Sequence, residues 1–459
     1  MIIDEIIQNK RKEVDQRKSF VSIEKIKAGL SPSVRDFKMA ISKGHGLNLI
    51  AEVKRKSPSK GTIRNDVNIF EIVKIYSQNH FVSAISFLTD YQYFGGTLEE
   101  MLQISLQTTK PVLCKDFIID EYQIYEARYF GADAILLIAS ELTTETMEHF
   151  INIAKSLKMD CLVEVHNEDE IVKLPSIVDI AGINNRNLKD FTISLDTTKK
   201  LSEKLRKKSN IIVTESGINT RNDVKKIIDF ADAILVGTSL MLNENPSARI
   251  ASLFKPDIKI CGITQLKDAI YCGENGVDYL GFIFSQKSKR YTDPRVSAAI
   301  STEIKDLFPQ VKLVGVFVNE DPKRVLDIMN RCQLDLAQLH GDETESFYYN
   351  FQDRVIKVFR IENQLDQIKI NQINNCQAKY VLMDTYSPNV YGGTGQSFNW
   401  KNIEKIKHRN LFVAGGINSE NYTDILGYKP DVLDISSGVE NSPGIKDYKK
   451  IDQILKGLK

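Results

Sequence analysis

Short apolar runs alternate with longer amphipathic segments along the first half of the chain. The apolar runs are rich in β-branched residues and nearly continuous in hydrophobicity, as parallel strands covered on both faces are. They lie at residues 47–55, 82–90, 111–116, 132–139, 160–166, 177–185, 210–217 and 231–237. The segments between them, such as 120–130 and 144–157, carry their apolar residues at the helical period. The pattern therefore predicts alternating strands and helices.

The pattern breaks off near Pro256 and then starts again. A second series of strands is predicted at residues 257–262, 277–284, 311–318, 334–341, 354–361, 379–385, 410–417 and 432–438. Eight strand–helix units occurring twice favour an α/β fold of two tandem (β/α)8 TIM barrels, the first in residues 1–254 and the second in 257–459. Two doubly wound open sheets would produce the same alternation, and the pattern alone leaves that alternative open.

Residues 1–46 precede the first predicted strand and have a helical pattern. The opening segment 1–7 places acidic residues among apolar ones, whereas a signal peptide has basic residues followed by an uninterrupted apolar stretch. We therefore expect an extra N-terminal helical element that covers one rim of the first barrel. No apolar run approaches the ~18 residues that cross a bilayer. These features predict a cytoplasmic protein.

The balance of charges limits the classes of partner. The chain carries 61 Lys and Arg against 60 Asp and Glu, a formal net charge of +1. Nucleic acids and anionic membrane surfaces attract strongly basic faces, so this balance argues against both. The six cysteines are scattered without a Cys-x-x-Cys pair, and the six histidines form no ligand cluster. We expect no disulfide, no metal and no redox cofactor.

Charged and polar residues recur at the ends of the predicted strands in the first half. The interior of a TIM barrel is packed, so charged residues within its strands are expected at the C-terminal mouth, where active sites lie. Glu52 and Lys54 face the same side of their strand, into the barrel mouth, and a plain ion pair between them is the alternative to a chemical role. Further strand ends supply Lys115, Glu164, Asn184 and Glu215. Burying so many charges around one mouth is costly unless they serve chemistry.

Glycine-containing turns follow the last two strands of this half. They are Glu215-Ser216-Gly217 and Val236-Gly237-Thr238-Ser239. Backbone N–H groups at these two places, beside a helix N-terminus, form the usual phosphate site of phosphate-binding barrels. A phosphorylated substrate is therefore expected.

These residues belong to motifs that occur, in the same order, in one known family. The motifs are Ile50-Ala51-Glu52-Val53-Lys54-Arg55-Lys56-Ser57-Pro58-Ser59-Lys60-Gly61, Leu88-Thr89-Asp90, Tyr93-Phe94-Gly95-Gly96, Lys115-Asp116-Phe117, Glu164-Val165-His166, Ile183-Asn184-Asn185-Arg186 and the two glycine turns. Over nearly all of residues 1–254 the chain resembles indole-3-glycerol-phosphate synthase. That family closes the pyrrole ring of indole with loss of carbon dioxide and water.

The resemblance implies roles for the residues at this mouth. Lys115 would be the general acid on the substrate carbonyl, and Glu164 its partner in dehydration. Lys54, oriented by Glu52, would hold the anthranilate carboxylate. Asn184 and Glu215 complete the catalytic set, and the substrate- or phosphate-binding residues are Ser57, Arg186, Ser216, Gly217, Gly237 and Thr238. A lysine among cationic neighbours can donate a proton near neutral pH, and we expect such a setting for Lys115.

The second half has its own polar residues at strand ends. Cys261 lies inside the first predicted strand of this half, where a cysteine is usually a small core hydrophobe. A cationic loop, 284–291, follows the second strand, and the fourth and sixth strands end near His340 and Asp384. A thiol and a carboxyl on opposite sides of a mouth can act as base and acid, with nearby cations lowering the pKa of the thiol.

A second set of motifs contains these residues. They are Lys259-Ile260-Cys261-Gly262-Ile263-Thr264, Ser288-Lys289-Arg290-Tyr291, Gln338-Leu339-His340-Gly341, Asp384-Thr385, the loop 392–395 and Asp434-Ile435-Ser436-Ser437-Gly438-Val439-Glu440. Over essentially all of residues 257–459 the chain resembles phosphoribosylanthranilate isomerase, which performs an Amadori rearrangement. The resemblance implies Asp384 as general acid on the ribose ring oxygen, Cys261 as general base at the adjacent carbon and Arg290 as the contact of the anthranilate carboxylate. The remaining binding residues are His340, Gly393, Gly416, Asp434, Ser436, Ser437 and Gly438.

The two resemblances predict two consecutive steps of tryptophan biosynthesis, because the product of the second half is the substrate of the first. The expected partners are phosphorylated anthranilate–sugar substrates, acted on by a monomer without cofactor or metal. One alternative is a pair of phosphosugar barrels of other specificity, such as one acting on histidine precursors; those typically use two aspartates, and Cys261 with Asp384 argues against it. The other is a non-enzymatic phosphate-binding scaffold, which requires the loss of a proposed acid or base, and none is lost.

Overall fold

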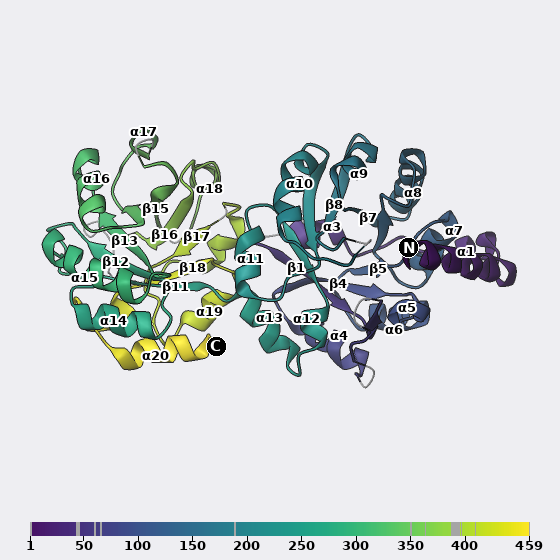
Figure 1. Cartoon of the computed structure of the whole chain (residues 1–459), viewed down its shortest axis with the longest axis horizontal. Coiled ribbons are helices and arrows are strands. Elements are labelled where there is room, and N and C mark those ends of the chain that lie inside the picture. Colours follow the sequence, from purple (N-terminus) through teal and green to yellow (C-terminus); the bar gives the residue numbers. More distant parts are fainter. Residues whose placement is uncertain are drawn as a thin grey trace. The chain divides into compact units, whose positions relative to one another are not determined.

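The computed structural model describes the chain except for residues 1, 43–45, 59–60, 65–66, 188–189, 349–350, 363, 387–394, 396, 409 and 459. The chain divides into two compact units, one containing Leu47–Phe254 with the N-terminal segment before it and the other containing Lys255–Lys459. In each unit helices surround a ring of strands (Figure 1). Each ring is a closed barrel of eight parallel strands, so the two tandem TIM barrels predicted from the hydrophobic pattern are confirmed.

The first barrel is closed by its first strand, which pairs with both the second and the last strand of the ring. Its strands are β1 (Asn48–Val53), β4 (Val82–Leu88), β5 (Val112–Lys115), β6 (Ala134–Ile138), β7 (Asp160–Val165), β8 (Val178–Asn184), β9 (Ser209–Glu215) and β10 (Ala233–Val236). Leu49 of β1 pairs with Val82 of β4 on one side and with Ile234 of β10 on the other. This double pairing excludes the open-sheet alternative.

Helices cover the outside of this barrel. They are α4 (Ile69–Gln78), α6 (Leu98–Leu106), α7 (Glu121–Tyr129), α8 (Thr144–Ser156), α9 (Glu168–Lys173), α10 (Asp196–Arg206), α11 (Arg221–Ile227) and α13 (Pro246–Phe254), with the short α5 (Tyr91–Phe94) and α12 (Thr238–Met241) near strand ends. A small hairpin, β2 (Lys56–Ser57) with β3 (Gly61–Thr62), follows β1 and was not predicted. Local caps fix where helices begin: Thr97 and Glu100 form a reciprocal capping box at the start of α6.

The predicted N-terminal helical element is present as α1 (Ile2–Phe20), α2 (Ile23–Ala28) and α3 (Phe37–Ser42). Phe37 and Ile41 of α3 are fully buried and pack with inward-facing strand residues such as Ile50 and Ala84. Lys38 of the same helix contacts the beginnings of β7 and β8, so α3 closes the N-terminal end of the barrel. α1 supplies apolar side chains to the opposite end, described below.

The second barrel repeats the arrangement. Its strands are β11 (Asp257–Cys261), β12 (Tyr279–Ile283), β13 (Lys312–Phe317), β14 (Leu336–Leu339), β15 (Val355–Ile361), β16 (Tyr380–Thr385), β17 (Leu411–Val413) and β18 (Val432–Ile435). Its helices are α14 (Leu266–Glu274), α15 (Pro294–Leu307), α16 (Pro322–Arg331), α17 (Glu345–Tyr348), α18 (Gln367–Asn374), α19 (Tyr422–Leu426) and α20 (Tyr448–Gly457), with three 3-10 turns, η1 (Gln352–Arg354), η2 (Trp400–Lys405) and η3 (Ser437–Val439). A hairpin of β19 (Glu440–Ser442) and β20 (Ile445–Lys446) after the last strand was not predicted.

Several predicted strands are too long at their C-terminal ends. The strand predicted to reach residue 417 ends at Val413, and the one predicted to reach 438 ends at Ile435. Gly415 and Gly416 have φ of +89° and +65°, a conformation that cannot continue a strand. The apolar run continues past the strand because the turn residues are themselves buried or small.

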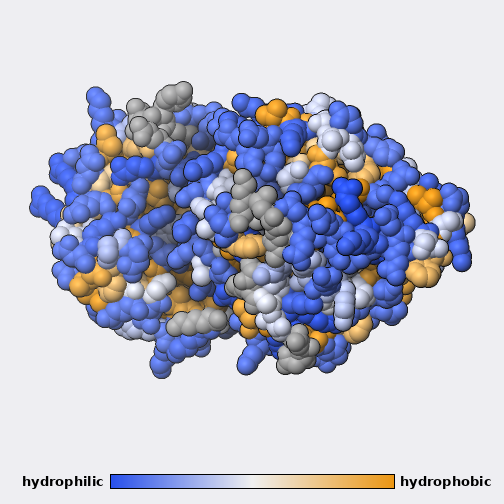
Figure 2. Space-filling model, turned by 45° about the vertical axis from the view of Figure 1, so that its right-hand side comes forward, coloured by the Kyte–Doolittle hydropathy of each residue, from blue (hydrophilic) through white to orange (hydrophobic). Residues whose placement is uncertain are grey.

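The surface is mixed in character. Hydrophilic residues dominate the face shown in Figure 2, with hydrophobic ones scattered among them. Within the described residues, no helix combines the length and hydrophobicity that crossing a bilayer requires.

Candidate active sites

A cavity of about 220 Å³ lies at the C-terminal mouth of the first barrel. Every residue predicted for the synthase site lines it, from β1, β2, β5, β7, β8, β9 and the turns after β8, β9 and β10: Glu52, Lys54, Ser57, Lys115, Glu164, Asn184, Arg186, Glu215, Ser216, Gly217, Gly237 and Thr238. The structure therefore brings together side chains that are spread over most of the first half of the sequence. Side chains alternate in direction along each strand, and the parallel strands of a barrel all end at one mouth, which accounts for this convergence.

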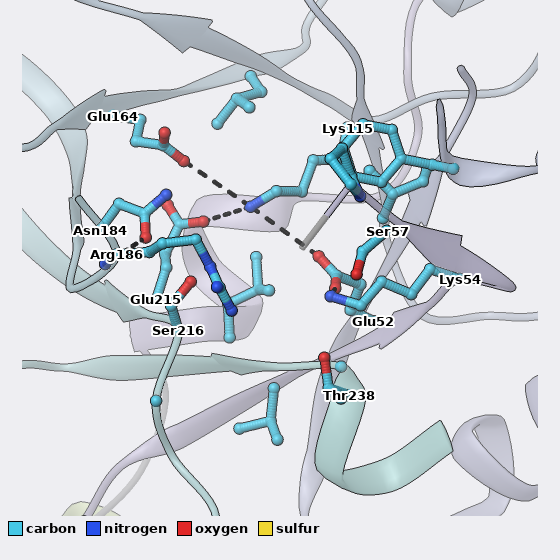
Figure 3. A pocket seen from close by; sticks show the side chains of 18 of the residues that line it. Glu52, Lys54, Ser57, Lys115, Glu164, Asn184, Arg186, Glu215, Ser216 and Thr238 are labelled. Carbon is cyan, nitrogen blue, oxygen red and sulfur yellow. Dashed lines mark hydrogen bonds and ion pairs between the residues drawn. The ribbon is translucent and has the colours of Figure 1, made fainter. Parts of the chain in front are cut away.

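Lys115 is the centre of the charged part of this cavity. Its Nζ lies 3.9 Å from Glu52 Oε2 and 3.8 Å from Glu164 Oε2, and it forms a close ion pair with Glu215 (Figure 3). Burial alone would lower the pKa of the Lys115 ammonium, but the three carboxylates, Glu215 first, raise this pKa above its usual value. The expectation of cationic neighbours is therefore wrong: the charges nearest Lys115 are negative. Its ammonium stays protonated and is available as a donor to a substrate oxygen.

The carboxylates around Lys115 differ in their affinity for protons. Burial raises the pKa of Glu215, with Glu164 adding to the effect, and Lys115 offsets only part of it. Burial acts in the same sense on Glu164, but hydrogen bonding to His166 and the charge of Lys115 prevail and hold the pKa of Glu164 well below its usual range. One mouth thus contains a carboxylate that stays ionised and a carboxyl that takes up a proton more readily.

His166 supports Glu164 from one side. Its Nε2 lies 3.2 Å from Glu164 Oε1, and its Nδ1 lies 3.1 Å from Glu170 Oε2. Burial lowers the pKa of the His166 ring, but these two carboxylates raise it more, to about 10. His166 is therefore a charged partner that orients Glu164.

Two glycines leave room for the carboxylates. A Cβ on Gly237 would overlap Glu52 Oε1, and one on Gly182 in β8 would overlap Glu215 Oε1. Glu52 in turn forms the predicted ion pair with Lys54, at 2.5 Å. Glycine at these positions is required by close approach rather than by turn geometry.

The other parts of the cavity wall are apolar or suited to an anion. Ile3 and Ile6 of α1, with Phe94 and Phe117, line one part, and the two phenylalanine rings lie 6.3 Å apart between centroids. A flat aromatic ring fits such a wall. Ser216 and Gly217 line another part and both have positive φ, as residues of anion-binding turns often do. The contribution of α1 was not foreseen from the sequence.

At the mouth of the second barrel, polar side chains form two linked pairs. His340 Nε2 lies 3.2 Å from Asp384 Oδ2, and Lys259 Nζ lies 2.8 Å from Asp434 Oδ2. Lys259 also forms a side-chain hydrogen bond with Cys261 on the same strand. Asp434 interacts electrostatically with both members of the first pair. The residues come from β11, β16, β18 and the position directly after β14, and all except Lys259 were among the predicted site residues.

The pKa shift of the Cys261 thiol differs from the one predicted. Burial raises the pKa of its thiol, and the cations Lys259 and Lys446 offset only part of that effect. The expected net lowering is therefore wrong, because the thiol is buried inside the strand ring rather than exposed to the cationic loop. Lys259 is the cation that hydrogen bonds to it, and Gly281 of the neighbouring strand leaves space for both side chains.

Arg290 of the cationic loop is held near the same mouth. It pairs with Glu440 in a bidentate arrangement, with Nε and Nη2 within 3.0 Å of the carboxylate oxygens. Glu440 also accepts from Lys446, whose Nζ donates to the Cys261 carbonyl oxygen at 2.5 Å. The loop after β12 is therefore tied to the strand end that carries Cys261.

The phosphate-type turns of this barrel are present where they were predicted. Gly416 has positive φ, and a Cβ on Gly438 would overlap the Ile417 carbonyl oxygen, so the two turns lie against each other. Ser436 and Ser437 lie in the second of these turns, where the Ser436 hydroxyl donates to the Cys261 carbonyl oxygen. The predicted Gly393 lies outside the described residues. Among the residues that the structure describes, no three His, Cys, Asp or Glu side chains form a group suited to a metal ion.

The comparisons with known proteins agree with this division. The family model "Indole-3-glycerol phosphate synthase" matches residues 3–253, and "N-(5'phosphoribosyl)anthranilate (PRA) isomerase" matches residues 258–457. A "Tryptophan biosynthesis protein TrpCF" of Buchnera aphidicola subsp. Schizaphis graminum is 36% identical over 464 residues, covering 100% of this chain and 99% of the relative. The protein of the same name from Vibrio cholerae serotype O1 is 34% identical over 465 residues, covering 100% and 96%.

Among solved structures, phosphoribosyl anthranilate isomerase from Thermotoga maritima is 37% identical, covers 44% of this chain and 98% of its own, and has a TM-score of 0.40. The tandem family matches and the full-length relatives show a bifunctional enzyme of tryptophan biosynthesis, with isomerase activity in the C-terminal barrel and synthase activity in the N-terminal one. The chain belongs to the family of TrpCF tryptophan biosynthesis proteins, an indole-3-glycerol phosphate synthase joined to a PRA isomerase.

Proposed function

We propose that Lys115 and Glu164 are the acid–base pair of the synthase reaction, and that Asp384 and Cys261 are that of the isomerase reaction. The observation that carries the synthase assignment is the ammonium of Lys115 among three carboxylates on the wall of a cavity. Buried charge of this density is costly to a fold and is typical of sites that move protons.

In the isomerase reaction, Asp384 gives a proton to the ribose ring oxygen as the bond between that oxygen and C1 breaks, and C1 forms an imine with the anthranilate nitrogen. Cys261, as thiolate, takes the proton from C2, and the resulting enolamine becomes the ketone by tautomerisation. His340, 3.2 Å from Asp384, supports this by orienting the carboxyl. Lys259 supports the thiolate through its hydrogen bond and positive charge.

In the synthase reaction, the ring carbon that bears the anthranilate carboxylate attacks the ketone carbon, and Lys115 donates a proton to the ketone oxygen. Carbon dioxide then leaves as the ring regains its aromaticity, with Lys54 holding the carboxylate until that step, and solvent returns to Lys115 the proton that it gave to the ketone oxygen. The new hydroxyl leaves as water with a proton from Lys115. Glu164, ionised at neutral pH, takes the proton that the adjacent carbon loses, and the indole ring is complete.

The remaining residues hold the substrates. Glu52 orients Lys54, while Asn184, Arg186 and Glu215 position the ring and chain of the synthase substrate. We assign its phosphate to Ser57, Ser216, Gly217, Gly237 and Thr238, and the isomerase phosphate to Gly393, Gly416, Ser436, Ser437 and Gly438. Arg290 contacts the anthranilate carboxylate in the isomerase site, with His340 and Asp434 beside the sugar. Positive φ at Gly217 and Gly416 supports the assignment, because such turns expose N–H groups to an anion.

Two matched variants of the intact chain test the acid–base assignments. Lys115→Met is expected to lower the rate of indole-glycerol-phosphate formation by about 10²–10⁴ and to leave isomerisation unchanged, since it removes one general acid. Asp384→Asn is expected to do the reverse. Each variant therefore contains its own folding control, measured by assaying the two steps separately. Full synthase turnover in Lys115→Met would remove that lysine from the mechanism.

We further propose that residues 1–254 and 257–459 are independent domains and that the enzyme is a cytoplasmic monomer. Each barrel has a hydrophobic core made of its own residues, which supports independent folding. All six cysteines are free, as is usual in a reducing compartment. Expressing the two segments separately should give two active fragments. Light scattering of the whole protein should give the mass of one chain, and cell fractionation should find it in the cytosol; a dimer mass or a membrane-bound fraction contradicts these points.

A further inference from the structure

Lys10 lies on the buried side of α1. The side chains of Ile3, Ile6, Ile7 and Val14 form an apolar stripe on the same helix face, spaced three or four residues apart. Lys10 falls in the middle of that stripe and is only 1% exposed. An ammonium at such a position loses its hydration, so it needs charged partners inside the protein.

Those partners come from the ends of two barrel strands. The Lys10 Nζ lies 2.9 Å from Asp90 Oδ2 and 2.9 Å from Asp116 Oδ1. Both aspartates are almost completely buried, and a third carboxylate, Glu13 on the next turn of α1, lies 3.0 Å away. One buried cation thus joins α1 to the segments that follow β4 and β5.

Asp116 ties this cation to the synthase site, because it lies between Lys115 and Phe117 in the sequence. The Phe117 N–H donates to Asp116 Oδ1 at 2.8 Å, and the Thr89 hydroxyl donates to Asp116 Oδ2 at 2.8 Å. Both residues that flank Asp116 line the cavity. The position of Asp116 therefore sets where the Lys115 ammonium and the Phe117 ring lie.

Asp90 performs a similar task for the other side of the wall. It caps α5, accepting a hydrogen bond from the Tyr93 N–H at 2.7 Å, and Phe94 of that helix lines the cavity. From α1 itself, Ile3 and Ile6 line the same cavity. Every segment that meets at Lys10 therefore contributes to the apolar wall.

We propose that Lys10 is a positioning residue of the synthase site, which locks α1 to the ends of β4 and β5 so that Lys115 and the apolar wall keep their places around the substrate. The proposal rests on the proposed function of Lys115. Stability by itself does not require a lysine here, because apolar side chains in place of a buried ion cluster often stabilise a fold as well or better. A charged cluster adds a fixed geometry between the groups that it joins.

The surroundings of the two aspartates predict how they respond to losing Lys10. The titratable groups that face them are Lys10 and Glu13 of α1, Tyr93 of α5, Cys114 of β5 and Glu126 of α7. Apart from Lys10, each of these groups is an acid that carries or can acquire a negative charge. Without the ammonium, the two buried carboxylates repel each other and lose the group that joins them.

The test uses three variants of the full chain. Lys10→Met removes the ammonium and keeps the length of the side chain. Lys18→Met is the matched control: Lys18 also ties α1 to the barrel, through an ion pair with Asp120 at 2.6 Å, but at an exposed position away from the cavity. Lys10→Met combined with Asp90→Asn restores the balance of charge. Synthase turnover, isomerase turnover and urea unfolding are measured for each variant.

In Lys10→Met, synthase kcat at neutral pH should fall about 10- to 100-fold, the range expected for a displacement of up to about 1 Å at a catalytic group, while isomerase kcat changes less than about twofold. The double variant should recover most of the rate, because it removes the repulsion between the two carboxylates. A merely structural lysine would instead lower the urea midpoint of the variant without lowering the synthase kcat of its folded fraction.

Three results overturn the proposal: synthase kcat within twofold of wild type in Lys10→Met, an equal loss in Lys18→Met, or no recovery in the double variant. If Lys10→Met alone does not fold, the double variant still decides between recovery and loss. Lys115→Met, assayed alongside, keeps the two proposals apart. Full turnover in Lys115→Met refutes the role of that lysine, and it does not depend on the outcome for Lys10.

Discussion

Gly281 offers a precise way to displace the proposed base of the isomerase without touching it. It lies in β12, directly opposite Cys261 of β11 in the strand register. A Cβ at this position would lie 2.8 Å from Cys261 Sγ and 3.2 Å from Lys259 Nζ. The prediction is that Gly281→Ala selectively damages isomerisation, because the new methyl group occupies the space of the thiol and of the ammonium that hydrogen bonds to it.

The size of the effect follows from these distances. Ordinary contact with a Cβ begins near 3.4 Å, so the sulfur must move by at least about 0.6 Å, and the Cys261 Cα, 3.2 Å from the new carbon, limits how the backbone can share the shift. Misplacing a catalytic group by about 1 Å can cost about 10²-fold in rate. We therefore expect isomerase kcat to fall about 10- to 100-fold. Overpacking should also lower the free energy of unfolding by about 1–3 kcal/mol.

Steady-state assays of the two reactions in the same protein measure this loss. Gly427→Ala is the matched control in the same barrel, because a Cβ there meets nothing within 4 Å and its φ of −60° suits alanine. Gly182→Ala is the mirror experiment: its Cβ would overlap Glu215 Oε1, so it should lower synthase turnover and spare the isomerase. Isomerase kcat within twofold of wild type in folded Gly281→Ala would refute the reasoning, since Cys261 could then be displaced without consequence.

Three further predictions concern single contacts. Lys259→Met should lower isomerase kcat by about 10² or more and move the pH optimum of isomerisation upward, because the thiol of Cys261 loses the cation that opposes the effect of burial on its pKa. An unchanged pH profile contradicts this prediction, and the synthase rate is the control. His166→Gln should flatten the pH dependence of stability. The pKa of His166 in the folded protein, about 10, exceeds the ordinary 6.5, so the stabilisation is complete below pH 6.5 and is lost as the pH rises to 10. The free energies of urea unfolding of wild type and variant, followed by synthase activity, should therefore converge towards pH 10. Gly438→Ala should raise the isomerase KM about tenfold or more with a smaller change in kcat, because its Cβ would overlap the Ile417 carbonyl oxygen and spread the two phosphate turns; an unchanged KM in steady-state kinetics would remove these turns from substrate binding.

The number of barrels and the strands that form them could be predicted from the sequence. Runs such as 132–139, nearly continuous in hydrophobicity, are local properties of the chain, and this one contains β6. The positions of Lys115 and Glu164 at strand ends were equally visible, because parallel strands in a barrel all end at one mouth. The small hairpins β2–β3 and β19–β20 carry no comparable signal, being two or three residues long.

The sequence by itself determined which residues stand at each mouth. Only the tertiary structure decided which charges surround those residues and how their pKa values shift. The charges around Lys115 are carboxylates from β1, β7 and β9, and the thiol of Cys261 is buried more than its cations can offset, so both predicted electrostatic settings were wrong. In the sequence, Lys10 is one more basic residue of an amphipathic helix. Its ion pairs with Asp90 and Asp116 inside the protein are visible only in the structure. Hydrophobic periodicity is set by neighbours along the chain, whereas a pKa and a close contact are set by neighbours in space.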